Sequence, residues 1–282
     1  ENQQSSAHNF VKDFSSILTR TESSFMFGVF LVNMEFALIL NSEYKDFWKF
    51  GFWLVGVIAI IGVFLLLRSK FELKNNSEEE QIEVSTNWGS LLRPQFLLFY
   101  ALIFFIVFSE QIFNSWLPTF YKNNLKTDSF FALQSSAFLA FFSFCGRLLA
   151  SKITQKTPPL KYFYFCLSVS IILLLIAHFL GYHAKENISL LVTLFPLVGM
   201  FLAPLYPLLN SKFLSQYSEK AVGRIVSAII LSTSLGGSIG SISTSYLFQK
   251  NLGNYYLLFA TIPLILILIF SSFLSLKKLK KT

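Results

Sequence analysis

The amino-acid sequence predicts an all-α, polytopic membrane protein with eight transmembrane helices. Hydrophobic residues make up 54% of the 282 residues and charged residues only 13%, whereas about a quarter of the residues in a soluble domain are charged. The apolar residues gather in eight runs, and crossing a bilayer takes roughly 20 helical residues. These runs are continuously apolar rather than alternating, which favours membrane helices over the strands of a membrane barrel.

The eight predicted spans are joined by short loops, with one exception. The spans cover residues 24–40, 47–67, 95–121, 129–150, 160–182, 187–209, 225–248 and 253–276. The first is the shortest and the least apolar. The exception is the long, mixed-charge connection 69–94, which separates a two-helix segment, residues 1–68, from a six-helix segment, residues 95–282. We expect this connection to be a cytoplasmic linker between domains.

The lysine and arginine residues set the expected orientation, because they are enriched in cytoplasmic loops. With the amino end inside, most of the 23 basic residues fall in cytoplasmic segments. Both termini of a multi-pass protein of the cell membrane are therefore predicted to be cytoplasmic. This topology also explains the formal net charge of +8. The basic residues are scattered between apolar runs, so we expect no nucleic-acid partner.

The third span places polar side chains at membrane depth: Glu110, Gln111 and Asn114, with Trp116 just beyond. An ionisable group there is costly and is a functional-site hypothesis by default. Residues four apart share a helix face, so Glu110 and Asn114 point together and Gln111 lies one step round the axis. A solute hydroxyl can bond to this cluster while Trp116 supplies an apolar face. The alternative is a hydrated glutamate near the outer end of the helix that has no role.

Two other spans carry candidate polar or small residues. The first span holds Glu35, the only other carboxylate expected deep in the membrane, beside Asn33. Near the end of the fourth span lie Gly146 and Arg147, where we expect the chain to enter the cytoplasmic loop. There the glycine permits close helix approach and the arginine reaches the interface. A merely topological arginine is the alternative.

The sixth and seventh spans contain helix-perturbing residues. In the sixth, Pro204 and Pro207 flank Tyr206. Prolines break backbone hydrogen bonds and locally unwind a helix, which is tolerated mainly where the backbone is buried or lines a cavity. The seventh contains three glycines among serines, and small residues of this kind are the ordinary means by which membrane helices pack. These glycines are Gly236, Gly237 and Gly240.

Taken in order, these motifs resemble the major facilitator superfamily, and most closely its fucose, glucose and galactose proton symporters. In that group the seventh helix carries a Glu, a Trp six residues later and then a Tyr, which matches Glu110, Trp116 and Tyr121. The segments FCGRLLASK, APLYPLL and SLGGSIG resemble parts of its eighth, tenth and eleventh helices. The resemblance implies two six-helix halves with the substrate site between them. The chain would then lack the first four helices.

We therefore expect a secondary active transporter, not an enzyme, that moves a small polar solute such as a sugar with proton coupling. Glu110 and Glu35 are the expected proton-coupling residues. Burial disfavours the charged form of a carboxyl group, so such a glutamate can change protonation as access alternates. The expected solute-binding residues are Glu110, Gln111, Asn114, Trp116, Asn33 and Tyr206. Gly146, Arg147, Pro204, Pro207, Gly236, Gly237 and Gly240 are expected to serve helix packing or gating.

The main alternative to transport is a non-transporting membrane sensor, or an inactive fragment of a transporter. A membrane-embedded transferase would need a polar catalytic cluster at a membrane boundary, and the sequence offers none. The sequence contains no HExxH and no Walker motif. We accordingly expect no metal, no cofactor and no catalytic residues. The expected partners are the lipid bilayer and the solute.

Overall fold

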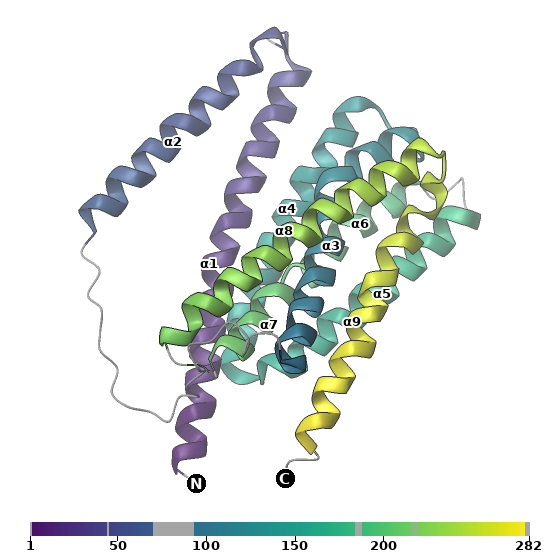
Figure 1. The fold of residues 1–282 in the computed structure, drawn as a ribbon. Coiled ribbons are helices and arrows are strands. Elements are labelled where there is room, and N and C mark those ends of the chain that lie inside the picture. Colours follow the sequence, from purple (N-terminus) through teal and green to yellow (C-terminus); the bar gives the residue numbers. More distant parts are fainter. Residues whose placement is uncertain are drawn as a thin grey trace.

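The computed structural model describes residues 2–43, 45–69, 93–183, 188–215, 217 and 219–279. Within these ranges it contains eight helical segments long and apolar enough to cross a membrane, and no β-strand. The predicted all-α, eight-span architecture is thereby confirmed. Residues 70–92, most of the predicted linker, lie outside the described residues. Figure 1 shows that α1 begins, and α9 ends, at the same end of the bundle.

Consecutive helices are joined by short connections, except for the long segment between residues 68 and 94. They are α1 (Asn2–Asn41), η1 (Lys45–Phe47), α2 (Lys49–Arg68), α3 (Pro94–Asn123), α4 (Ser129–Lys156), α5 (Pro159–His183), α6 (Ile188–Leu202), α7 (Leu205–Leu214), α8 (Glu219–Gln249), η3 (Gly253–Tyr255) and α9 (Tyr256–Leu279). Helices α6 and α7 are two pieces of one span, interrupted at Ala203 and Pro204.

The first span begins much earlier than the predicted residue 24, because its amino-terminal half is helical but not apolar. Its membrane-compatible stretch is Lys12–Asn41. Ser15, Ser16, Thr19 and Ser23 are buried there. Ser16 and Ser151 of α4 lie with their hydroxyl oxygens 3.0 Å apart, so a small polar seam joins the two helices. Small polar residues let membrane helices approach closely, and an apolar-run criterion cannot detect this portion of the helix.

Helix α2 is apolar on every side and contributes little to the core. Of its residues only Gly51 is buried, against Phe36 of α1. Large side chains such as Trp53 and Leu67 are exposed. A helix that is hydrophobic all round is typical of a membrane span. Figure 1 shows α2 leaning away from the other helices, connected to them through the hairpin with α1.

Helix α3 runs through the core and packs on α4, α8 and α9. On the α8 side the approach is close, because a Cβ at Gly236 or Gly240 would meet the carbonyl oxygen of Phe104 or Phe108 at 2.5 or 2.9 Å. On the α9 side the Tyr256 hydroxyl donates to the carbonyl of Ile112 at 2.9 Å. Helix α3 is thus held firmly on two sides, which fixes the position of its polar residues.

Candidate functional site

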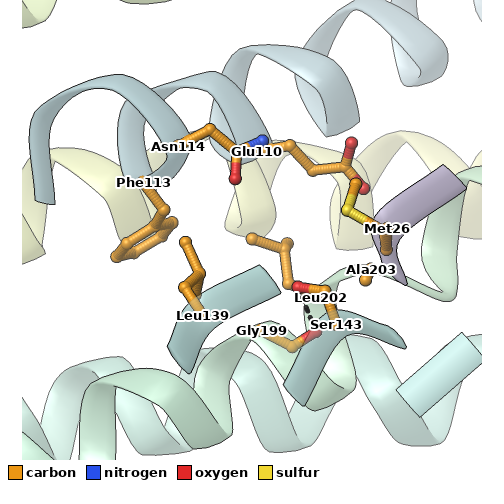
Figure 2. A pocket seen from close by; sticks show the side chains of 9 residues that line it. All are labelled: Met26, Glu110, Phe113, Asn114, Leu139, Ser143, Gly199, Leu202 and Ala203. Atoms are coloured by element: carbon orange, nitrogen blue, oxygen red, sulfur yellow. Dashed lines mark hydrogen bonds between the residues drawn. The ribbon is translucent and has the colours of Figure 1, made fainter. Parts of the chain in front are cut away.

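The polar face of α3 opens onto a small pocket between α1, α3, α4 and α6. Glu110 and Asn114 both line it, as their four-residue spacing predicts (Figure 2). The other lining residues are mostly apolar: Met26, Phe113, Leu139, Ser143, Gly199, Leu202 and Ala203. The pocket therefore combines one carboxylate, one amide and one hydroxyl with apolar walls. Its free volume is about 10 Å³, room for about one water molecule, so a larger solute requires the helices that line the pocket to move apart.

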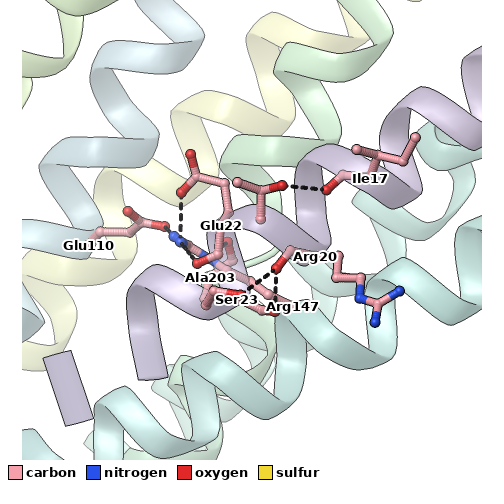
Figure 3. Close-up of polar contacts among 9 residues, drawn as sticks. Ile17, Arg20, Glu22, Ser23, Glu110, Arg147 and Ala203 are labelled. Carbon is pink, nitrogen blue, oxygen red and sulfur yellow. Dashed lines mark hydrogen bonds and ion pairs between the residues drawn. The ribbon is translucent and has the colours of Figure 1, made fainter. Parts of the chain in front are cut away.

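Beside this pocket lies a buried ion cluster centred on Arg147 (Figure 3). Arg147 Nη1 lies 3.0 Å from Glu22 Oε2, and Nη2 lies 3.4 Å from Glu110 Oε1. Nη1 also donates to the backbone carbonyl of Glu22 at 3.1 Å. The guanidinium is planar, and its fixed fork of donors lets it bind two carboxylates at once. The cluster joins α1, α3 and α4 at one point.

The expected position of Arg147 at a cytoplasmic loop is therefore wrong. Its side chain is only 2% exposed, and α4 continues for nine residues beyond it, to Lys156. The helix can continue because its last turns, like the facing portion of α1, carry small hydroxyl residues. Ser151 and Thr154 are both buried there. Because lysine and arginine are enriched in cytoplasmic loops, that rule alone assigns a basic residue in such a stretch to a loop.

Glu22 is the functional candidate that the sequence analysis missed. It lies within the first membrane-compatible helix, and its side chain is 31% exposed. The predicted span begins two residues later, at residue 24, which puts Glu22 at a membrane edge. No local pattern relates Glu22 to Arg147, which is 125 residues away in the chain. The recurrence of small hydroxyl residues at positions 15, 16, 19 and 23, which share one face of a helix, is the sequence signal that could extend the helix.

The cluster is unbalanced in charge. Two carboxylates share one guanidinium, so with all three groups ionised the cluster carries one net negative charge, and a single proton neutralises it. The Glu110 contact is longer than the Glu22 contact, and Glu110 is the less exposed of the two, at 15%. Water does little to stabilise a charge in such a site. The arrangement can therefore exchange one proton, with Glu110 as the carboxylate that contacts the pocket.

The interruption between α6 and α7 supplies a further hydrogen-bond acceptor for Arg147. Its Nε donates to the carbonyl of Ala203 at 3.0 Å. At the preceding residue of α4, a Cβ on Gly146 would overlap the backbone of Met200, so α4 and α6 are in backbone contact there. One turn before Arg147, the Ser143 hydroxyl donates to the carbonyl of Gly199 at 3.5 Å. The Gly146–Arg147 pair thus meets the proline-containing interruption in the structure.

Two predicted site residues on α3 face α8 rather than the pocket. Trp116 donates from Nε1 to the Ser241 hydroxyl at 3.3 Å and stacks on Phe248. Gln111 donates to the Ser115 hydroxyl on its own helix, and its side chain is among the nearest neighbours of Gly237. The structure therefore does not bring Trp116 together with Glu110, because six residues on a helix lead to a different face.

The remaining predicted residues differ in their distance from the cluster. Tyr206, at the start of α7, lies close enough to Glu22, Glu110 and Arg147 to interact with their charges. Asn33 and Glu35 lie further along α1, and Glu35 is near Gly51 of α2. At 1.5 Å per residue, Glu35 is about 20 Å along the helix axis from Glu22. The structure does not bring Glu35 and Glu110 together.

A helical bundle of eight membrane spans around a buried ion cluster and a small pocket defines a multi-pass membrane protein with an ionisable site in its interior. Residues 11–241 match the family model of the Major Facilitator Superfamily. The chain therefore belongs to the major facilitator superfamily, a family of membrane transporters, as the motifs predicted.

A solved structure agrees with this assignment. It is described as the crystal structure of a major facilitator superfamily transporter, FucP, in the outward conformation. The similarity has a TM-score of 0.60 at 19% sequence identity, over 80% of this chain and 54% of that chain. At this identity the likeness concerns the fold, and this chain spans about half the length of FucP. No curated protein sequence matches the chain significantly.

Proposed function

We propose that the chain acts in secondary active transport of a small polar solute, such as a sugar, coupled to protons. The observation that carries this proposal is the Glu22–Arg147–Glu110 cluster beside a pocket that Glu110 itself lines. Ionisable groups at membrane depth mark substrate pathways and proton relays. The cluster also joins α1, from the two-helix segment, to α3 and α4 of the six-helix segment, so its protonation bears on contact between these segments.

In this proposal the pocket contacts the solute through Glu110, Asn114 and Ser143, and Phe113 and Leu139 face its apolar side. Tyr206 belongs to the same region because of its proximity to the charges. Gln111, Trp116 and Asn33 contribute to a wider pathway rather than to this pocket. Polar side chains on a membrane helix are more stable facing a water-filled pathway than facing lipid.

Proton coupling follows from the charge imbalance of the cluster. When Glu110 is ionised, Arg147 binds both carboxylates and holds α1, α3 and α4 together. When Glu110 takes up a proton, its attraction to Arg147 falls, and the Arg147–Glu22 pair, at 3.0 Å, is the stronger remaining contact. Helix α3 is then freer to move relative to α1. Both termini are placed in the cytoplasm in this proposal, with the solute pathway between the two segments.

The test is uptake into proteoliposomes with and without an imposed proton gradient, comparing wild type with Glu110→Gln. Glutamine keeps the size of the side chain but cannot exchange a proton at neutral pH. We expect gradient-driven accumulation to fall at least about tenfold, because loss of a required proton site removes the coupling. A panel of sugars, polyols and nucleosides supplies the candidate solutes.

Glu35→Gln is the matched variant for this test. It makes the same change on α1, at a distance from the pocket, and we expect a much smaller effect. Gradient-driven uptake that survives Glu110→Gln unchanged would show that Glu110 has no coupling role. Equal losses of gradient-driven uptake in the two variants would instead indicate that Glu35 also takes part in proton coupling.

A further inference from the structure

The two prolines of the α6–α7 span each leave one backbone carbonyl without its helical donor. In an α-helix the N–H of residue i+4 donates to the carbonyl of residue i. Proline has no N–H, so Pro204 cannot donate to the carbonyl of Met200, and Pro207 cannot donate to that of Ala203. The backbone of Pro204 itself is close to helical, with φ −69° and ψ −17°. These two carbonyls are therefore available to donors outside the helix.

Both available carbonyls face consecutive residues of α4. The Met200 carbonyl lies against Gly146, where no side chain intervenes, and the Ala203 carbonyl accepts from Arg147 Nε at 3.0 Å. Ala203 and Arg147 are both buried. Burying a carbonyl without a hydrogen-bond donor costs free energy. The bond from Arg147 therefore stabilises this packing by satisfying the Ala203 carbonyl.

The bond at Nε fixes the rest of the guanidinium. Because the group is planar and rigid, holding Nε determines where Nη1 and Nη2 point. In the structure they reach Glu22 and Glu110 on two different helices. We propose that Pro207 is a positioning residue: by denying the Ala203 carbonyl a helical donor, it keeps that carbonyl available for Arg147 and so aims the guanidinium at both carboxylates. The consequence for proton coupling rests on the proposed function, whereas the positioning itself does not.

The first test is a double-mutant cycle on the purified full chain in detergent, with Pro207→Ala and Arg147→Lys. Alanine at 207 brings an N–H that competes for the Ala203 carbonyl, so in the wild-type background Arg147 Nε loses its acceptor. Lysine keeps the charge but has no N–H at this position, so in its background the carbonyl is free and the new N–H satisfies it. We expect Pro207→Ala to lower the unfolding midpoint by about 2 to 4 °C in wild type and to raise it by a similar amount in Arg147→Lys.

The second test measures the pH at which Glu110 takes up a proton, because this pH depends on whether the Arg147 guanidinium points at Glu110. The charged or titratable groups around Glu110 are Glu22 from α1, Arg147 from α4 and Tyr206 from α7. Infrared spectroscopy detects a protonated carboxyl group, and the band that disappears in Glu110→Gln belongs to this residue. In Pro207→Ala the guanidinium is no longer directed at Glu110. Since a nearby cation favours the carboxylate, its withdrawal should move the midpoint of that band to higher pH by about one unit.

Pro263→Ala is the control for both tests, since Pro263 is a buried proline inside α9, away from the cluster. It should leave the Glu110 band where it is. An equal stability change from Pro207→Ala in both backgrounds, or an unmoved band, would overturn the proposal. If Pro207→Ala does not fold, Pro207→Val brings the same N–H with more of the original bulk. Neither measurement requires solute or transport, so failure of the uptake test and failure of this proposal are distinguishable.

Discussion

Replacing Arg147 with methionine is expected to destabilise the protein more than any other single change at the site. The substitution removes the cation shared by Glu22 and Glu110 and leaves the Ala203 carbonyl without its donor. Removing one partner of a buried ion pair costs about 3 to 5 kcal/mol, because the remaining charge is left unpaired. Thermal unfolding of the purified protein measures the loss, and gradient-driven uptake should be lost with it.

Two further variants make this expectation specific. Arg20→Met removes an exposed arginine from α1 and should change stability by no more than about 0.5 kcal/mol. Adding Glu22→Gln and Glu110→Gln to Arg147→Met should recover a portion of the loss, because neutral amides no longer need a cation. Recovery should stay incomplete, since the Ala203 carbonyl remains unpaired. A triple variant that is no more stable than Arg147→Met would mean that the charges are not the cause of the loss.

The fold was largely predictable because membrane spans depend on continuous apolar runs. Each of the eight predicted spans corresponds to a span in the described part of the chain, and the one large difference, the earlier start of α1, has a clear cause. Residues such as Ser16 and Thr19 are polar but bury themselves against α4. Burial of small hydroxyl residues between helices leaves no trace in a hydropathy pattern. Helix packing in membranes relies on such residues, so errors of this kind are expected where two helices meet closely.

The sequence predicts only those features of the candidate site that depend on residues close together on one helix. The four-residue spacing of Glu110 and Asn114 predicts a shared face, and both residues line the pocket. The partner of Glu110 was not predictable in the same way, because Arg147 lies on another helix and its charge is also explained by the positive-inside rule. Nor could the sequence say that Trp116 would bond Ser241 of α8. Contacts between helices depend on how the helices rotate against one another, and this is decided by packing.

Gly146→Ala is the second change with a large expected effect, and it tests the packing on which the cluster depends. A Cβ at residue 146 would lie 2.7 Å from the carbonyl carbon of Met200 and 2.8 Å from its Cα, and backbone atoms cannot rotate away as a side chain can. Helix α6 must therefore move. We expect a loss of about 1 to 3 kcal/mol, the usual cost of overpacking, measured by thermal unfolding.

The matched control is Gly237→Ala on α8. There the nearest atoms to an added Cβ belong to the Gln111 and Val107 side chains, at 3.9 Å, which is an ordinary contact. This variant should be neutral or gain up to about 1 kcal/mol, because alanine is the better helix former. Since moving α6 also withdraws the Ala203 carbonyl from Arg147, the losses from Gly146→Ala and Arg147→Met should be less than additive. Full additivity would mean that the close approach at Gly146 and the ion cluster are independent.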